Sequence, residues 1–92
     1  MRSEDVVATR FTPTRFRDGY DQDQVDDLLD RITATFAALE QGRGPGPLTA
    51  DEVIAAKFQA TRFREGYDQD QVDAFLDQVV IALRTAEPPA AG

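Results

Sequence analysis

The amino-acid sequence contains the same segment twice. TRFRDGYDQDQVD at residues 14–26 returns as TRFREGYDQDQVD at residues 61–73, an offset of 47 positions in a chain of 92. Fifteen of the twenty-one residues in 10–30 are identical to their counterparts in 57–77. Such a repeat indicates a duplicated supersecondary unit, whose chemistry is present in two copies. Features found in both copies are therefore the first candidates for the function.

Neither copy is long enough to be stable alone, because isolated units near 40 residues usually need outside support. We divide the chain into a first repeat at residues 1–40, a Gly/Pro linker at 41–47, a second repeat at 48–86 and a disordered tail at 87–92. We expect the two repeats to complete each other's core within one chain as a monomeric pseudo-dimer. The alternative is a homodimer in which two chains exchange repeats.

The composition argues against catalysis and against metal or cofactor binding. There is no His or Cys and a single Ser, so no catalytic triad or dyad can be assembled. The acidic run DQDQVDD differs from a calcium-binding loop, because its sixth position is Asp26 rather than Gly and its twelfth is Ile32 rather than Glu. The sequence predicts a protein that is not an enzyme and has no cofactor.

The charge is distributed unevenly along each repeat. Basic residues without acids occupy 10–17 and 57–64, and acidic residues follow from Asp18 and from Glu65. The net charge of −7 makes nucleic acid an unsuitable partner. With no apolar run near 20 residues and no signal-peptide pattern at the start, we expect a cytoplasmic protein.

Local signals place two helices in each repeat. Thr49 and Glu52 form a capping-box pattern ahead of a short helix, and Ser3 with the following acids is a looser version. The segments FTPTRFRDGY and FQATRFREGY read as irregular, with Gly19 and Gly66 expected at positive φ. A long helix then follows each N-cap, Asp21 or Asp68, in which Gln24 or Gln71 is the expected reciprocal acceptor.

The long helices have one apolar face each, at helical spacing over about 18–20 residues. These faces consist of Val25, Leu28, Leu29, Ile32, Phe36 and Leu39 in the first copy, and of Val72, Phe75, Leu76, Val79, Val80 and Leu83 in the second. The spacing suits coiled-coil-like packing over two to three heptads. We therefore predict an all-α fold in which the two long helices pack as a coiled-coil-like pseudo-dimer.

The order of these motifs resembles a known bacterial family. LT-x-x-(D/E)-V, then K-F, then F-R-x-GYD-x-D-x-VD-x-FLD-x-V looks like the N-terminal domain of DivIVA, a division and polar-growth scaffold, which the division regulator GpsB shares. Residues 48–83 match throughout, and the first repeat departs by having Leu28 where the family prefers Phe. The resemblance implies a short helix, a crossed hook-like turn and a helix that dimerises as a parallel coiled coil.

Two features differ from that family. Its members usually carry one copy of the domain and continue into a long coiled coil, whereas this chain carries two copies whose helices end after about five turns. The tandem arrangement is the reason for expecting the copies to pair with each other.

The resemblance to DivIVA implies a membrane-contact element at the tip of each hook. The corresponding residues here are Phe16 with Arg17 and Phe63 with Arg64. A Phe can enter the acyl boundary of an anionic membrane while the guanidinium binds phosphate. The alternative is that both phenylalanines are core residues of the hook.

The resemblance to GpsB implies a peptide-binding site instead. There a tyrosine and two acids of the following helix bind an arginine from the cytoplasmic tail of a partner membrane protein. The corresponding sets are Tyr20, Asp26 and Asp30, and Tyr67, Asp73 and Asp77. Each acid pair is spaced i, i+4 and so faces one way. The alternative is that arginines of the fold already neutralise these acids: Arg15, Arg17, Arg62 or Arg64.

The sequence thus predicts a non-enzymatic adaptor or scaffold of bacterial cell division or polar envelope growth. Its expected partners are division or envelope proteins, with an anionic membrane surface as a further candidate. It would then be cytoplasmic, or peripheral at the inner face of the membrane at a pole or septum. The alternative function is an oligomerisation module, or a regulator that pairs with a full-length DivIVA-type protein.

Overall fold

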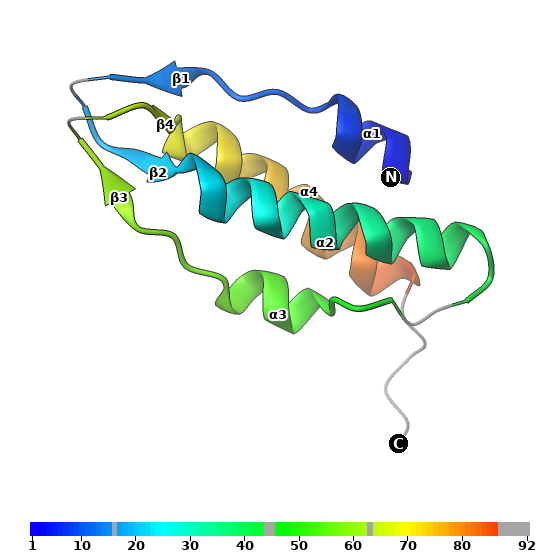
Figure 1. Ribbon diagram of the computed structural model, residues 1–92. Helices are drawn as coiled ribbons and strands as arrows, with labels where there is room; N and C mark the ends of the chain where they lie inside the picture. The colour runs from blue at the N-terminus through cyan, green and yellow to red at the C-terminus, as the bar shows by residue number, and fades with distance from the viewer. Residues whose placement is uncertain (16, 44–45, 63, 87–92) are drawn as a thin grey trace.

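In the computed structural model, which describes residues 1–15, 17–43, 46–62 and 64–86, each repeat runs from a short helix through two short strands into a long helix (Figure 1). The elements of the first repeat are α1 (Ser3–Ala8), β1 (Pro13–Thr14), β2 (Gly19–Asp21) and α2 (Gln22–Glu40). Those of the second are α3 (Ala50–Ala55), β3 (Ala60–Thr61), β4 (Gly66–Tyr67) and α4 (Gln69–Ala86). We call residues 11–21 and 58–68 the hooks.

The four strands form one antiparallel sheet in which every pairing joins the two repeats. The strand order is β1-β4-β2-β3, so strands of the first and second repeats alternate. At the centre of the sheet Tyr20 lies opposite Tyr67, its own counterpart in the other repeat. If each strand is replaced by its counterpart in the other repeat, the order becomes β3-β2-β4-β1, which is the same order counted from the other edge. The sheet therefore has a pseudo-two-fold axis between these tyrosines. The hooks are thus interlocked within one chain.

The prediction of an all-α fold was wrong, because the hooks that we expected to be irregular form this four-stranded sheet. The strands are only two or three residues long, which is too short for an alternating pattern to be recognised in a sequence. Their partners lie in the other repeat, so no local turn signal could reveal the pairing.

The predicted apolar faces of the long helices do lie on the core, but not as a simple two-stranded coiled coil. Each short helix packs on the long helix of its own repeat, α1 on α2 and α3 on α4. The core therefore contains residues from all four helices, with Val6 and Val53 covering the faces of the long ones. The most deeply buried apolar residues of the long helices recur at matched positions: Val25 and Val72, Ile32 and Val79, Phe36 and Leu83.

The hook glycines are required for close packing and not for a positive φ. Of the glycines that the structure describes, Gly42 after α2 is the one at positive φ (72°), where it suits the end of a helix. A Cβ on Gly19 would collide with Thr14 Oγ1 and lie 3.0 Å from the carbonyl oxygen of Tyr67. A Cβ on Gly66 would collide with Thr61 Oγ1 and lie 2.9 Å from that of Tyr20.

The helix starts agree with the predicted caps, with two corrections. Asp21 and Asp68 accept hydrogen bonds from the backbone N–H of Gln24 and Gln71, both at 3.0 Å. The two glutamines are not reciprocal acceptors, since they reach across to the other repeat. Gln24 Oε1 accepts from Gln59 N, and Gln71 Oε1 from Thr12 N, both at 2.7 Å.

The second correction concerns the start of the first repeat. The capping box of Thr49 and Glu52 is present, with the two backbone-to-side-chain bonds both at 3.2 Å. Ser3, which we expected in the corresponding role, instead donates from its N–H and its hydroxyl to Glu40 at the end of α2. This contact ties the start of the chain to the end of the long helix.

Over the residues described, none of the helices is both long and apolar enough to cross a membrane.

Candidate functional site

Two matching grooves flank the long helices. Groove 1, of about 490 Å³, lies between α1 and α2, and groove 2, of about 610 Å³, lies between α3 and α4. The lining of each includes a tyrosine of the other repeat. The lining of groove 1 is Val6, Val7, Thr9, Arg10, Phe11, Asp26, Leu29, Asp30, Thr33 and Tyr67. The lining of groove 2 is Val53, Ile54, Ala56, Lys57, Phe58, Asp73, Leu76, Asp77, Val80 and Tyr20. The two sets correspond position by position at the repeat offset, so the fold builds one site twice.

The tyrosines combine with the acids of the opposite repeat. Tyr67 Oη donates to Asp26 Oδ1 at 2.9 Å, and Tyr20 Oη donates to Asp73 Oδ1 at 2.8 Å. From the sequence we had expected each tyrosine to combine with the acids of its own repeat. The structure brings the six residues into two sets, but with the tyrosines exchanged. The cause is the central strand pair, which carries each tyrosine across to the other long helix.

Both phenols are held in their protonated form. Burial raises the pKa of Tyr20 to about 12, and the hydrogen bond to Asp73 adds to the shift. Burial likewise raises the pKa of Tyr67 to about 12, with the bond to Asp26 as the second cause. Each hydroxyl is therefore a donor that orients one carboxylate of the groove.

The four groove acids lack a cationic partner within the part of the chain that the structure describes. No Lys or Arg nitrogen of these residues lies within 4.0 Å of a carboxylate oxygen of Asp26, Asp30, Asp73 or Asp77. All four are exposed, and each pair lies one helical turn apart on the same face. Each groove thus presents two negative charges that no ion pair among the described residues compensates.

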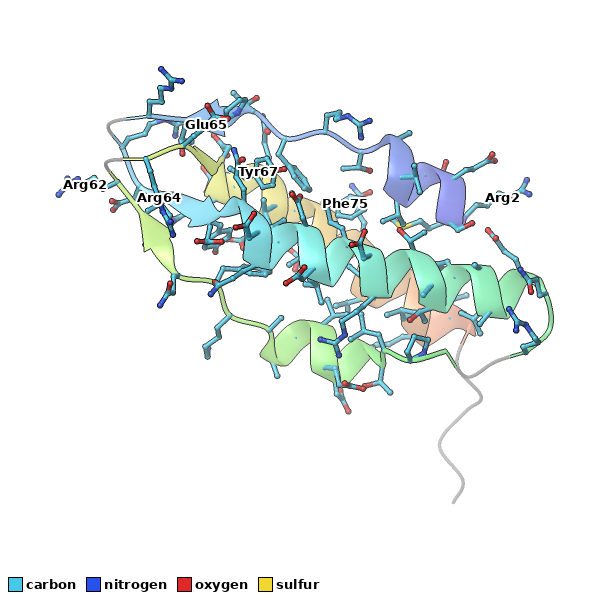
Figure 2. All side chains as sticks on the ribbon, viewed as in Figure 1. Arg2, Arg62, Arg64, Glu65, Tyr67 and Phe75 are labelled. Carbon is cyan, nitrogen blue, oxygen red and sulfur yellow. The ribbon has the colours of Figure 1, made fainter. Side chains whose placement is uncertain are left out.

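The hook arginines bind other acids. Arg17 pairs with Asp68 at 3.0 Å, and Arg64 pairs with Asp21. At the outer part of the hooks Arg15 lies 3.5 Å from Glu65, and Arg62 lies 3.7 Å from Asp18. All four pairs join one repeat to the other, at the sheet end of the molecule where Figure 2 labels Arg62, Arg64 and Glu65. In the structure these arginines therefore stabilise the interlocked hooks and leave the groove acids free.

The predicted membrane-contact residues fall only partly within the structure. Phe16 and Phe63 lie outside the described residues. Arg17 and Arg64 are both engaged with the N-cap carboxylates, although their side chains stay more than half exposed.

A phenylalanine lies beside the tyrosine of each groove, and the sequence had not pointed to it as part of the site. Phe11 packs against Tyr67 with a centroid separation of 5.5 Å, and Phe58 packs against Tyr20 at 5.1 Å. Phe75 adds an edge contact to Phe11 at 5.8 Å, and Figure 2 shows Tyr67 and Phe75 near α2. The signal was available, because Phe11 and Phe58 are identical residues at the same position of the repeat.

A larger cavity of about 900 Å³ lies between α1, the end of α2 and α4. Of the acids that line it, Glu40 accepts two bonds from Ser3 and lies 3.9 Å from Arg2 Nε, and Asp5 accepts from Arg2 N. These two bonds from Ser3 are the main reason that the pKa of Glu40 is lowered. On the other side Leu48 takes the place of Met1 and is 3% exposed, whereas Met1 is 41% exposed. The cavity thus corresponds to the place that Leu48 fills in the other repeat.

Within the described ranges no cluster of three or more acids is arranged to hold a metal ion. The chain matches no family model, no curated protein and no solved structure.

Proposed function

We propose that the chain is a non-enzymatic adaptor that binds cationic segments of partner proteins in its two grooves. The observation that carries this proposal is the repetition of one arrangement. Both grooves combine an acid pair without a cation, a tyrosine that orients one of the acids, and a phenylalanine beside it.

An arginine suits this arrangement better than other side chains. Its planar guanidinium can bond both carboxylates of a pair at once, and its face can lie over the adjacent aromatic ring. Its arrival also removes the repulsion between carboxylates spaced i, i+4. Since the tyrosine hydroxyl already bonds one oxygen of Asp26 or Asp73, the remaining oxygens are those directed to a ligand.

The resemblance to the DivIVA and GpsB domain supplies the biological setting of the proposal. The partner would be a division or envelope-growth protein of a bacterium, with an arginine in its cytoplasmic tail. The adaptor would then act in the cytoplasm, next to the inner face of the cell membrane at a pole or septum. Contact of the hooks with anionic lipid would add to this recruitment, provided that Arg17 and Arg64 keep or exchange their ion pairs.

Burial of the long-helix faces favours the adaptor over an oligomerisation module. Val25, Ile32, Val72 and Val79 are at most 1% exposed. A partner helix could reach them only after the interlocked hooks had opened. The proposal therefore includes a monomeric state in solution, with a mass of 10.2 kDa that does not change with concentration.

The test is a calorimetric titration with a short peptide that contains one central arginine and with the same peptide carrying neutral citrulline. We expect the arginine peptide to bind, and citrulline to weaken it at least about tenfold, because hydrogen bonds to charged groups contribute about 1.5–3 kcal/mol. Replacing Asp30 and Asp77 with Asn in one protein should abolish the preference for arginine over citrulline.

The matched control replaces Asp23 and Asp70 with Asn. These two residues also correspond to each other between the repeats, and their substitution removes the same charge, but they do not line the grooves. If the two double variants weaken peptide binding equally, the effect comes from the overall charge of the protein, and the grooves are not the binding sites. If the protein binds anionic vesicles and does not bind arginine peptides, the hooks and not the grooves are the functional surface.

A further inference from the structure

The two grooves agree at six of their ten lining positions and differ at the other four. The agreement covers both acids, the tyrosine, the phenylalanine and two apolar residues of the floor. The differences are Val7 against Ile54, Thr9 against Ala56, Arg10 against Lys57 and Thr33 against Val80. The residues that would recognise a cation are therefore the same in both grooves. The four positions that differ, which we call the wall of each groove, surround them with different side chains.

The wall of groove 1 is the more polar one. Thr9 Oγ1 donates to the carbonyl of Asp5 at 2.7 Å, and Thr33 Oγ1 donates to that of Leu29 at 2.9 Å. With their hydrogens used in this way, both hydroxyl oxygens can still accept a bond from a ligand. In groove 2 the same positions carry methyl groups, from Ala56 and Val80, and the space is larger, about 610 Å³ against 490 Å³.

The grooves also differ in how their own cation is held. Arg10 Nη1 donates to the carbonyls of Val7 at 2.7 Å and of Thr9 at 2.9 Å, which fixes the guanidinium at the end of α1. This fixed positive charge competes with an arriving cation. Lys57 takes part in no ion pair with the described residues, so its flexible side chain can move into solvent. The acids of groove 2 are thus more available.

We propose that the grooves bind two different partner segments, an inference that rests on the proposed function. Groove 2 takes, with the higher affinity, an arginine next to a branched apolar residue. Groove 1 takes, more weakly, an arginine next to small or polar residues. Because the grooves lie on opposite sides of the long helices, beneath α1 and α3 in turn (Figure 1), one chain can bridge two partner molecules.

The experiment isolates each groove with a single substitution. Asp30→Asn leaves groove 2 intact, and Asp77→Asn leaves groove 1 intact; both residues are exposed, so the fold should be kept, which circular dichroism verifies. Each variant is titrated with two peptides that differ only in having leucine or serine beside the arginine. We expect the Asp30→Asn variant to prefer the leucine peptide by at least about fivefold, from partial burial of the leucine. The Asp77→Asn variant should bind both peptides more weakly and without that preference.

Exchange of the walls provides the second measurement. Thr9→Ala with Thr33→Val in the Asp77→Asn background should give groove 1 the preference for leucine, and Arg10→Gln should strengthen arginine binding there about threefold. Methyl resonances separate the sites in the unmodified chain, since the leucine peptide should shift Ile54 and Val80 at lower concentration than Val7. Equal affinities and equal preferences in the two single variants would overturn this inference while leaving the proposed function intact. The absence of arginine-dependent binding in every variant would overturn both.

Discussion

The hooks and the grooves contain similar charged residues and use them in opposite ways. In the hooks every arginine lies close to a carboxylate of the other repeat, and these pairs connect the two halves of the sheet. One or two helical turns further along α2 and α4, the groove acids have no such partner among the residues described. The hook acids are compensated within the fold, whereas the groove acids converge in pairs beside an aromatic ring, an arrangement that suits a ligand. The contrast separates a structural end of the molecule from its candidate binding surfaces.

The largest expected effect comes from filling the space at the centre of the hook sheet. Gly66→Ala places a methyl group against Thr61 Oγ1 and 2.9 Å from the carbonyl oxygen of Tyr20, which belongs to the backbone of the central strand pair and cannot retreat without disturbing it. We expect the free energy of unfolding to fall by about 3 kcal/mol, at the upper end of overpacking effects. Thermal and urea unfolding provide the measurement.

Gly42→Asn is the control for Gly66→Ala. The position has positive φ, which Asn tolerates, and a Cβ there meets nothing within 4 Å. We expect a loss of only a few tenths of a kcal/mol. Similar losses at the two positions would mean that the hooks are not closely packed.

The second prediction removes a hook charge. Arg64→Gln leaves the Asp21 carboxylate, which is 12% exposed, without its cation. Because Asp21 keeps its bond from Gln24 N and the guanidinium is mostly exposed, we expect a loss of about 1–2 kcal/mol at neutral pH. The comparison variant is Arg43→Gln, an exposed arginine after α2, which should change stability by less than about 0.5 kcal/mol. A loss no larger than that of the comparison variant would contradict a structural role for the hook charges.

The third prediction concerns the groove tyrosines. Both have a folded-state pKa of about 12, above the ordinary value of 10.0. A raised folded-state pKa means that the folded chain retains protons which the unfolded chain has released. The free energy of unfolding should therefore be independent of these groups below about pH 10 and fall as the pH rises from 10 to 12.

Ultraviolet titration tests this directly, because the chain has two tyrosines and no tryptophan. We expect one transition near pH 12 in the folded protein, moving toward 10 in urea. Asp73→Asn should lower the midpoint of Tyr20 alone and split the curve. A midpoint near 10 in the folded chain would mean that the tyrosines are neither buried nor bonded to the groove acids.

Much of the helical structure could be predicted from the sequence because its signals are local. The 3.6-residue period placed Val25, Ile32, Val72 and Val79 on the core, and the caps at Asp21 and Asp68 were visible from their neighbours. The sheet could not be predicted, because its strands obtain their partners from the other copy. The exchange of Tyr20 and Tyr67 between the grooves follows from the pairing of strands of different repeats. It could therefore not be predicted from the sequence either.

The smallest effect is the most direct test of the contrast between hooks and grooves. If the groove acids are uncompensated, Asp30→Asn with Asp77→Asn should stabilise the chain by a few tenths of a kcal/mol at each site, since each change removes a repulsion spaced i, i+4. The gain should shrink in high salt, which screens exposed charges. Removal of a hook charge should instead lower the free energy of unfolding. The two measurements therefore distinguish acids that stabilise the fold from acids that are available to a ligand. A loss of stability on removing Asp30 and Asp77 would place these carboxylates among the structural charges, and the grooves would then need another explanation.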